Sequence, residues 1–87
     1  MTNIETTTDA RGRTSRTYID GDSIEFGTNA AIIMETGYGT FDVYLGWFER
    51  NGWNGSQEFF CARGGKPVKT LKGAERRVSK WFAEAAA

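Results

Sequence analysis

The stretch that decides the fold is Phe41-Asp42-Val43-Tyr44-Leu45-Gly46-Trp47-Phe48. Its apolar residues recur with the two-residue period of a β-strand. One face of that strand would carry Phe41, Val43, Leu45 and Trp47. We expect this face to point into the core.

A helix is expected over residues 71–85, after the last strand. Thr70 is a good N-cap for it. One stripe of this segment carries, at helical spacing, Leu71, Ala74, Val78, Trp81, Phe82 and Ala85. We expect the stripe to lie across the apolar face of residues 41–47. Gly73 weakens the first turn by about 1 kcal/mol relative to Ala.

Turn-forming residues divide the rest of the chain into further strands. Residues 18–26 are typical of a hairpin, because the pair Asp20-Gly21 supplies the positive φ that a tight turn needs. Residues 30–36 and 57–63 are two more strand candidates. Pro67 lacks an amide donor, so residues 66–69 should form a sheet edge or a connector. The predicted fold class is α+β: an antiparallel meander of about four to five strands packed against one C-terminal helix.

Residues 1–16 are polar, rich in Thr and without periodicity, which predicts a flexible N-terminal tail before a single domain at 17–87. The tail carries Arg11, Arg13 and Arg16, which could instead become ordered on a negatively charged partner. Its first residues do not resemble a secretory signal, and the longest apolar run, residues 30–34, is too short to span a membrane. We therefore expect no membrane association.

The chain has no histidine and one cysteine. Ser-His-Asp and Cys-His catalysis, His-ligated metals and tetrahedral zinc sites all need residues that are missing. We predict that the protein is not an enzyme and needs no metal or cofactor. A single cysteine is typical of a reducing compartment, which predicts a cytoplasmic location. Cys61 should be a small buried hydrophobe; a reactive thiol would need a cationic neighbour, for which Arg63 is the local candidate.

Charge is distributed unevenly along a chain whose net charge is zero. Residues 1–62 carry a charge of −5 and residues 63–87 a charge of +5, with Glu75 the only acid between Arg63 and Lys80. Such a basic stretch is typical of a surface that binds nucleic acid or an acidic protein, although any amphipathic helix also needs a solvated face. The candidate partner-binding residues here are Arg63, Lys66, Lys69, Lys72, Arg76, Arg77 and Lys80.

Two other features are candidates for contact with a partner. Trp53 lies between Asn51-Gly52 and Asn54-Gly55, where an aromatic can act as a contact anchor or fold back over the sheet edge. Carboxylates spread over the hairpins could imitate the spacing of phosphates, or serve only solubility. These acids are Asp20, Asp22, Glu25, Glu35, Asp42, Glu49 and Glu58. The glycine segments 37–39 and 64–65 lack the spacing of phosphate-binding loops, so we interpret both as turns.

The closing unit resembles the strand–turn–helix endings of small accessory proteins carried by phages and other mobile elements. It reads Phe59-Phe60-Cys61-Ala62-Arg63-Gly64-Gly65-Lys66-Pro67-Val68-Lys69-Thr70-Leu71-Lys72-Gly73-Ala74-Glu75-Arg76-Arg77. The short, histidine-free chain resembles an anti-CRISPR protein of that kind. This resemblance implies a stoichiometric inhibitor that binds a CRISPR–Cas effector in the host bacterial cell and blocks its guide, target or nuclease recruitment. It carries no functional residue across.

The leading hypothesis is a non-enzymatic inhibitor that binds a host protein complex. The alternative is a small nucleic-acid-binding module that uses residues 63–80. Zero net charge counts against the alternative, because duplex-binding proteins usually carry excess positive charge. A third hypothesis is a domain that oligomerises through an exposed sheet edge near Pro67. The sequence does not determine the oligomeric state.

Overall fold

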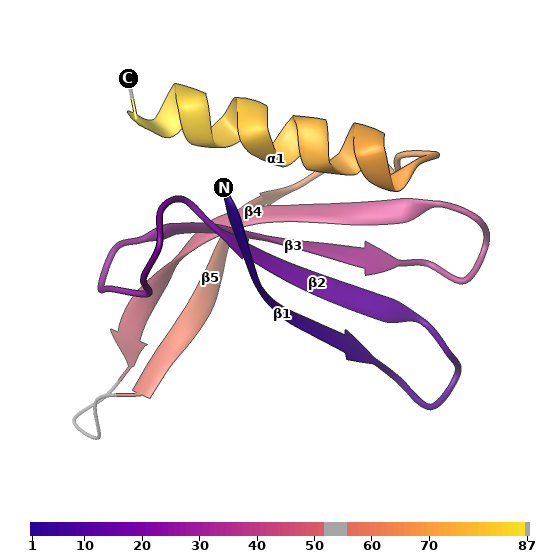
Figure 1. Cartoon of the computed structure of the whole chain (residues 1–87), viewed down its shortest axis with the longest axis horizontal. Helices are drawn as coiled ribbons and strands as arrows, with labels where there is room; N and C mark the ends of the chain where they lie inside the picture. Colours follow the sequence, from indigo (N-terminus) through magenta and orange to yellow (C-terminus); the bar gives the residue numbers. More distant parts are fainter. Residues whose placement is uncertain (52–55, 87) are drawn as a thin grey trace.

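A computed structural model describes the backbone of residues 1–51 and 56–86, and the side chains within 1–50 and 58–85. The strands are β1 (Thr2–Thr8), β2 (Thr14–Ile19), β3 (Asn29–Glu35), β4 (Phe41–Asn51) and β5 (Ser56–Gly64), followed by α1 (Leu71–Ala86). Each strand pairs antiparallel with its neighbour in the chain, in the order β1-β2-β3-β4-β5 (Figure 1). The predicted α+β meander with one C-terminal helix is confirmed.

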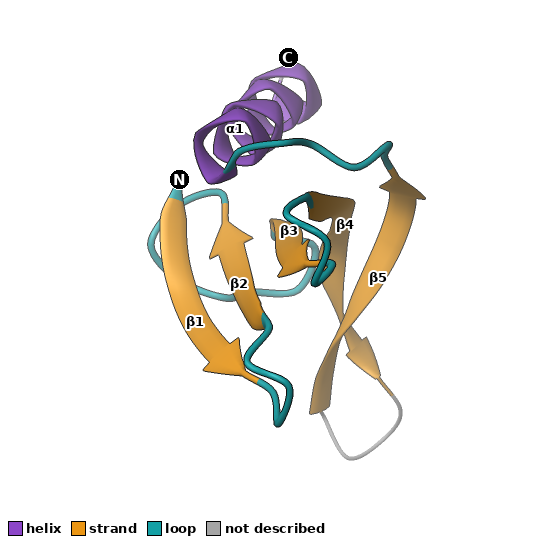
Figure 2. Cartoon of the chain, turned by 90° about the vertical axis from the view of Figure 1, so that its right-hand side faces the viewer, coloured by secondary structure: helices purple, strands orange, loops and turns teal. Residues whose placement is uncertain are grey.

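The core lies between α1 and the middle of the sheet, where the helix packs on β3 and β4 (Figures 1 and 2). Its buried cluster consists of Tyr18, Ala31, Ile33, Val43, Leu45, Ala74, Val78 and Phe82. The alternation predicted for residues 41–48 is confirmed at Val43 and Leu45, and Phe41 packs against the cluster from its margin. Trp47 is outside the cluster; its ring stacks on that of Phe60 across β4 and β5, with centroids 6.5 Å apart.

The apolar stripe of the helix is confirmed in its first three turns. Ala74, Val78 and Phe82 are buried, and Leu71 and Trp81 pack against the same cluster. Ala85 was predicted to belong to the stripe, but it is exposed together with the two residues before it. The last described turn of the helix therefore adds no core contact.

The prediction of a flexible tail at residues 1–16 is wrong. Residues 2–8 form β1, which pairs with β2 from Thr2↔Ile19 to Thr8↔Thr14, so the predicted boundary at residue 17 falls inside β2. The turn between these strands is closed by Asp9, whose carboxylate oxygen Oδ1 accepts the backbone N–H groups of Arg11 and Arg13 at 2.9 and 3.0 Å. β1 is an edge strand with mostly exposed side chains, so it shows no hydrophobic alternation in the sequence.

The predicted hairpin at residues 18–26 is also wrong. β2 ends at Ile19 and β3 begins at Asn29, and the intervening residues form a loop in which Ile24 and Phe26 are exposed. The Asp20 N–H donates to the Asn29 carbonyl at 3.0 Å, which closes the loop at its base. β3 takes the place beside β2 because its Ala31 and Ile33 side chains are buried under the helix.

A β-bulge shapes the edge strand β5. Leu45 faces Arg63 and Gly46 faces Cys61, so Ala62 is the extra residue. A Cβ atom at Gly46 would overlap the Phe60 carbonyl oxygen, which explains why a glycine stands there. The prediction that Cys61 is buried is wrong: the residue is exposed, because it lies on the edge strand opposite a glycine that offers no side chain to cover it.

The connector between β5 and α1 is fixed to the sheet. Val68 forms an isolated bridge to Phe41, with N–H···O distances of 2.7 and 2.8 Å. This agrees with the prediction that residues 66–69 around Pro67 form a connector. The bridge holds the start of the helix beside the start of β4.

Candidate functional site

The first turn of α1 sets which side chains face outward. The Thr70 hydroxyl accepts the backbone N–H of Gly73 at 3.0 Å, as a helix cap does. A Cβ atom at Gly73 would lie 2.9 Å from Thr70 Oγ1 and 3.1 Å from Val68 Cγ1. The glycine that weakens the helix by propensity therefore permits the close approach of the cap and the connector.

Glu75 turns toward the sheet. The hydroxyl of Tyr18, a residue only 3% exposed, donates a 2.8 Å hydrogen bond to Glu75 Oε2. Burial, followed by this hydrogen bond and the carboxylate charge, raises the pKa of Tyr18 to about 12. The phenol is therefore a protonated donor at neutral pH. The only acid between Arg63 and Lys80 is thereby held on the inner flank of the helix.

The outward side of the helix and its connector are basic. Along the helix, Lys72, Arg76 and Lys80 recur every four residues and are all exposed, on the side away from Val78. Lys66 and Lys69 of the connector are also exposed. No ion pair within the described part of the chain involves any of these five residues. We call the group formed by Lys66, Lys69, Lys72, Arg76 and Lys80 the basic surface.

Two of the predicted site residues have other roles in the structure. Arg77 is partly buried, lies over Gly65 and donates a 3.0 Å hydrogen bond from Nη1 to the Lys66 carbonyl. Its guanidinium holds the connector against the helix. Arg63 forms a 3.7 Å ion pair with Glu84, both side chains being more than half exposed. A third predicted contact residue, Trp53, lies outside the described residues.

The carboxylates do not form one acidic face. Glu35 forms a 3.7 Å ion pair with Arg16, and Glu49 accepts a 2.8 Å hydrogen bond from Trp47 Nε1. Asp42 lies opposite Met34, one residue along from the Glu35–Phe41 pair, and so points to the other side of the sheet. The exposed loop 20–28, at the end of the sheet nearest the C-terminal end of α1, carries Asp20, Asp22 and Glu25 (Figure 1).

Tyr38, which is not among the contact residues predicted from the sequence, has 90% of its surface exposed. It stands at the tip of the β3–β4 turn between Gly37 and Gly39, whose φ angles are 86° and 78°. The Thr36 hydroxyl accepts the Tyr38 N–H at 3.1 Å and lies 2.8 Å from the Thr40 hydroxyl. Glycine on both sides of a tyrosine is the signal in the sequence for this exposed tip, although the pattern by itself predicts only a turn.

The β1–β2 turn lies beside this tip. A Cβ atom at Gly37 would lie 3.3 Å from the Arg13 side chain, which is itself fixed by a 3.0 Å bond from Nε to Asp9 Oδ2. The backbone N–H of Arg13 is the main cause that lowers the pKa of Asp9, with the Arg11 N–H and the Arg13 side chain adding to it.

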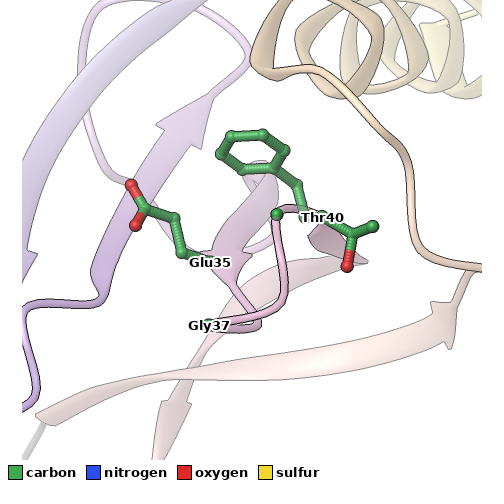
Figure 3. Close-up of a pocket in the computed structure, with 5 residues that line it drawn as sticks. Glu35, Gly37 and Thr40 are labelled. Carbon is green, nitrogen blue, oxygen red and sulfur yellow. The ribbon is translucent and has the colours of Figure 1, made fainter.

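Three shallow hollows lie around the two turns. One, of about 270 Å³, is lined by Arg11, Arg13 and Tyr38 among others, and a second, of about 330 Å³, extends from Tyr38 to Asp42. The third, of about 260 Å³, lies between Glu35 and Thr40 with Gly37 at its rim, and the Glu35 carboxylate points away from the turn (Figure 3). None of the three is enclosed. They suit contact with a surface better than capture of a small molecule.

Within the described residues, no three Cys, Asp or Glu side chains gather as they would around a metal ion. The described helix is too short and too polar to cross a membrane. Comparison with protein-family models, with curated proteins and with solved structures finds no match to this chain.

Proposed function

We propose that the chain is a non-enzymatic inhibitor that docks on an acidic surface of a protein complex through the basic surface. The observation that carries this proposal is the orientation of Glu75. Its carboxylate accepts the Tyr18 hydroxyl, and within the described residues it forms no ion pair with the cations on the outer side of the helix. Rows of exposed cations of this kind steer association with surfaces of opposite charge and fix the orientation of binding.

The resemblance of the closing unit to phage accessory proteins supports a specific target. We propose a CRISPR–Cas effector complex in the cytoplasm of a bacterial host, which the protein would inhibit stoichiometrically. The resemblance covers roughly residues 56–84, which contain β5, the connector and most of α1. It implies no functional residue, so the basic surface is proposed from the geometry of the helix and connector alone.

Charge elsewhere on the molecule favours a protein partner over nucleic acid. Net charge is zero, and the loop 20–28 presents Asp20, Asp22 and Glu25 to solvent. A long polyanion that extended beyond the helix would meet these carboxylates, whereas an acidic patch of protein has a limited area. Binding of nucleic acid remains the second candidate function, because the four-residue spacing of Lys72, Arg76 and Lys80 presents three cations in one row.

A phage plating assay tests the proposal. Bacteria that carry an active CRISPR–Cas system would express the wild-type chain, the double variant Arg76→Glu/Lys80→Glu, or the control Arg11→Glu/Arg50→Glu. The control changes net charge equally but alters exposed residues outside the basic surface. We expect wild type and control to restore plaques of a targeted phage, and the double variant to lose most of this effect. Equal plating by all three, or no rescue across the CRISPR types tested, would contradict the proposal.

A further inference from the structure

The edge strand β5 presents an exposed apolar segment on its outer side. Among the described elements β5 pairs only with β4, and it lies at the edge of the sheet (Figure 2). Phe60, whose ring also stacks on Trp47, is partly exposed, and Cys61 and Ala62 are exposed. The only protection of this edge within residues 58–62 is the bulge at Ala62, because the segment contains no Lys or Pro, and unpaired N–H and C=O groups on an edge strand bind other strands.

We propose that β5 pairs antiparallel with β5 of a second copy of this chain. A two-fold axis perpendicular to the sheet would pass beside Phe60, so that each Phe60 faces its counterpart. In this register Phe59 of one copy lies opposite Cys61 of the other, and Glu58 lies opposite Ala62. Aromatic pairs and aromatic–aliphatic pairs of this kind stabilise neighbouring strands.

Charge complementarity selects a second copy as the occupant. Arg63 follows the extra residue Ala62, so the carboxylate of Glu58 in one copy would approach the Arg63 guanidinium of the other. Arg63 is held within its own copy only by the exposed 3.7 Å ion pair with Glu84, so it can also accept this contact. The two-fold symmetry makes the contact twice, and no like charges lie directly opposite one another in the strand pairs from Glu58 to Ala62.

The other edge of the sheet lacks this self-complementarity. β1 pairs only with β2 on its inner side, so its outer edge is also unpaired. Glu5 is the central residue of β1, and a two-fold pairing about the middle of this strand would place Glu5 opposite Glu5. Like charges directly opposite one another destabilise a strand pair. Self-association is therefore directed to β5.

Pairing through β5 would make one continuous sheet with both helices on the same face. A two-fold axis perpendicular to a sheet does not exchange its faces, so the basic surfaces of the two copies would point to the same side. A partner with two acidic patches would then be bound at two points.

Sedimentation equilibrium of the purified chain over a range of concentrations tests the dimer and its register. Ala62→Glu would place two pairs of like charges across the axis, whereas Ala62→Lys would place Lys opposite Glu58. Because Ala62 is exposed, both variants should keep the monomer fold, which circular dichroism would verify. We expect a wild-type dimer whose dissociation constant rises about tenfold in Ala62→Glu and falls in Ala62→Lys. Thr6→Glu on β1 should leave the dissociation constant of the dimer at its wild-type value.

Two results would overturn the proposal. One is a wild-type chain that stays monomeric up to millimolar concentration. The other is a dimer whose dissociation constant changes in Thr6→Glu but not in Ala62→Glu or Ala62→Lys, which would place the contact at β1.

Cys61 provides a second test of the register. The two Cys61 Cα atoms would lie about 8 Å apart on one face, too far for a disulfide but within reach of a short bis-maleimide. We expect the cross-linker to join two copies and a mild oxidant to join none. Rapid disulfide formation with oxidant alone would show a register centred on Cys61 and contradict the Phe60 axis.

Discussion

The Tyr18 hydroxyl and the Glu75 carboxylate, 57 residues apart in the chain, are joined by a 2.8 Å hydrogen bond. This bond connects β2 to the flank of α1. It also holds the one acid of the stretch from Arg63 to Lys80 on the inner side of the helix. A contact that stabilises the fold thus also keeps this carboxylate away from the basic surface.

Tyr18→Phe removes this hydrogen bond and leaves the ring in place. Hydrogen bonds to charged groups contribute roughly 1.5–3 kcal/mol, and we expect a loss of that size in the free energy of unfolding. Urea denaturation at pH 7 would measure it. A variant as stable as wild type would show that the bond does not hold the helix.

The same residue should make stability sensitive to alkali. The pKa of Tyr18 is raised in the folded state to about 12 from 10.0, so the protonated phenol stabilises the fold. This contribution to the free energy of unfolding, roughly 2 kcal/mol, is fully present below pH 10. It is lost as the pH rises through 12. Denaturation measured at pH 9, 10, 11 and 12 should show a steeper decline for wild type than for Tyr18→Phe. Parallel declines would contradict the assignment.

Phe82 and Trp81 should differ in their contribution to the core. Phe82 is 4% exposed and belongs to the buried cluster, whereas Trp81 packs at its margin. Phe82→Ala should therefore destabilise the domain by about 3–5 kcal/mol and Trp81→Ala by less. The sequence pattern places both residues on the same apolar stripe and does not distinguish them. Thermal denaturation of both variants would decide, and a greater loss for Trp81→Ala would show that the helix is rotated.

Gly46 on β4 and Gly64 on β5 allow a crowded glycine to be compared with an open one. A Cβ atom at Gly46 would overlap the Phe60 carbonyl, whereas at Gly64 its nearest neighbour would be Tyr44 Cδ1 at 3.6 Å. We expect Gly46→Ala to destabilise the protein by roughly 1–3 kcal/mol, because the bulged strand must shift. Gly64→Ala should be close to neutral. Similar urea midpoints for the two variants would contradict the close approach of β4 and β5.

The strands and helix that carry strong hydrophobic periodicity could be predicted from sequence. Val43, Leu45 and Val78 are buried as their spacing requires. β1 could not be found this way, because an edge strand of Thr residues has no apolar face; only the turn residues Asp9 and Gly12 hinted at a hairpin. The pair Asp20-Gly21 was misleading, since it opens a long loop and not a tight turn.

The site was only partly predictable for a related reason. A four-residue spacing places Lys72, Arg76 and Lys80 together on any helix, so the row followed from sequence. The position of Arg77 against the connector depends on how residues 64–70 return to the sheet, which no local pattern encodes. The exposure of Tyr38 and Cys61 likewise depends on which strand lies at an edge and which turn lies at a tip.

Binding of random duplex DNA should separate the two candidate functions. If Lys72, Arg76 and Lys80 contact phosphates, the slope of log affinity against log salt should be near −2.7, by about −0.9 for each contact. Arg77 is not included, because its guanidinium is bonded to the Lys66 carbonyl. We expect only weak binding at physiological salt in a fluorescence anisotropy titration. Tight binding with the steep slope would favour the nucleic-acid module.

The most direct measurement is a titration of a purified CRISPR–Cas effector with the protein, followed by cleavage of target DNA. We expect inhibition by the wild-type chain to be complete near a one-to-one ratio of chain to binding site. Arg76→Glu/Lys80→Glu should need a far larger excess, mainly because it associates more slowly, while Arg11→Glu/Arg50→Glu should match wild type. Cleavage that is unaffected by saturating protein in every effector type, or equal inhibition by the double variant, would contradict docking through the basic surface.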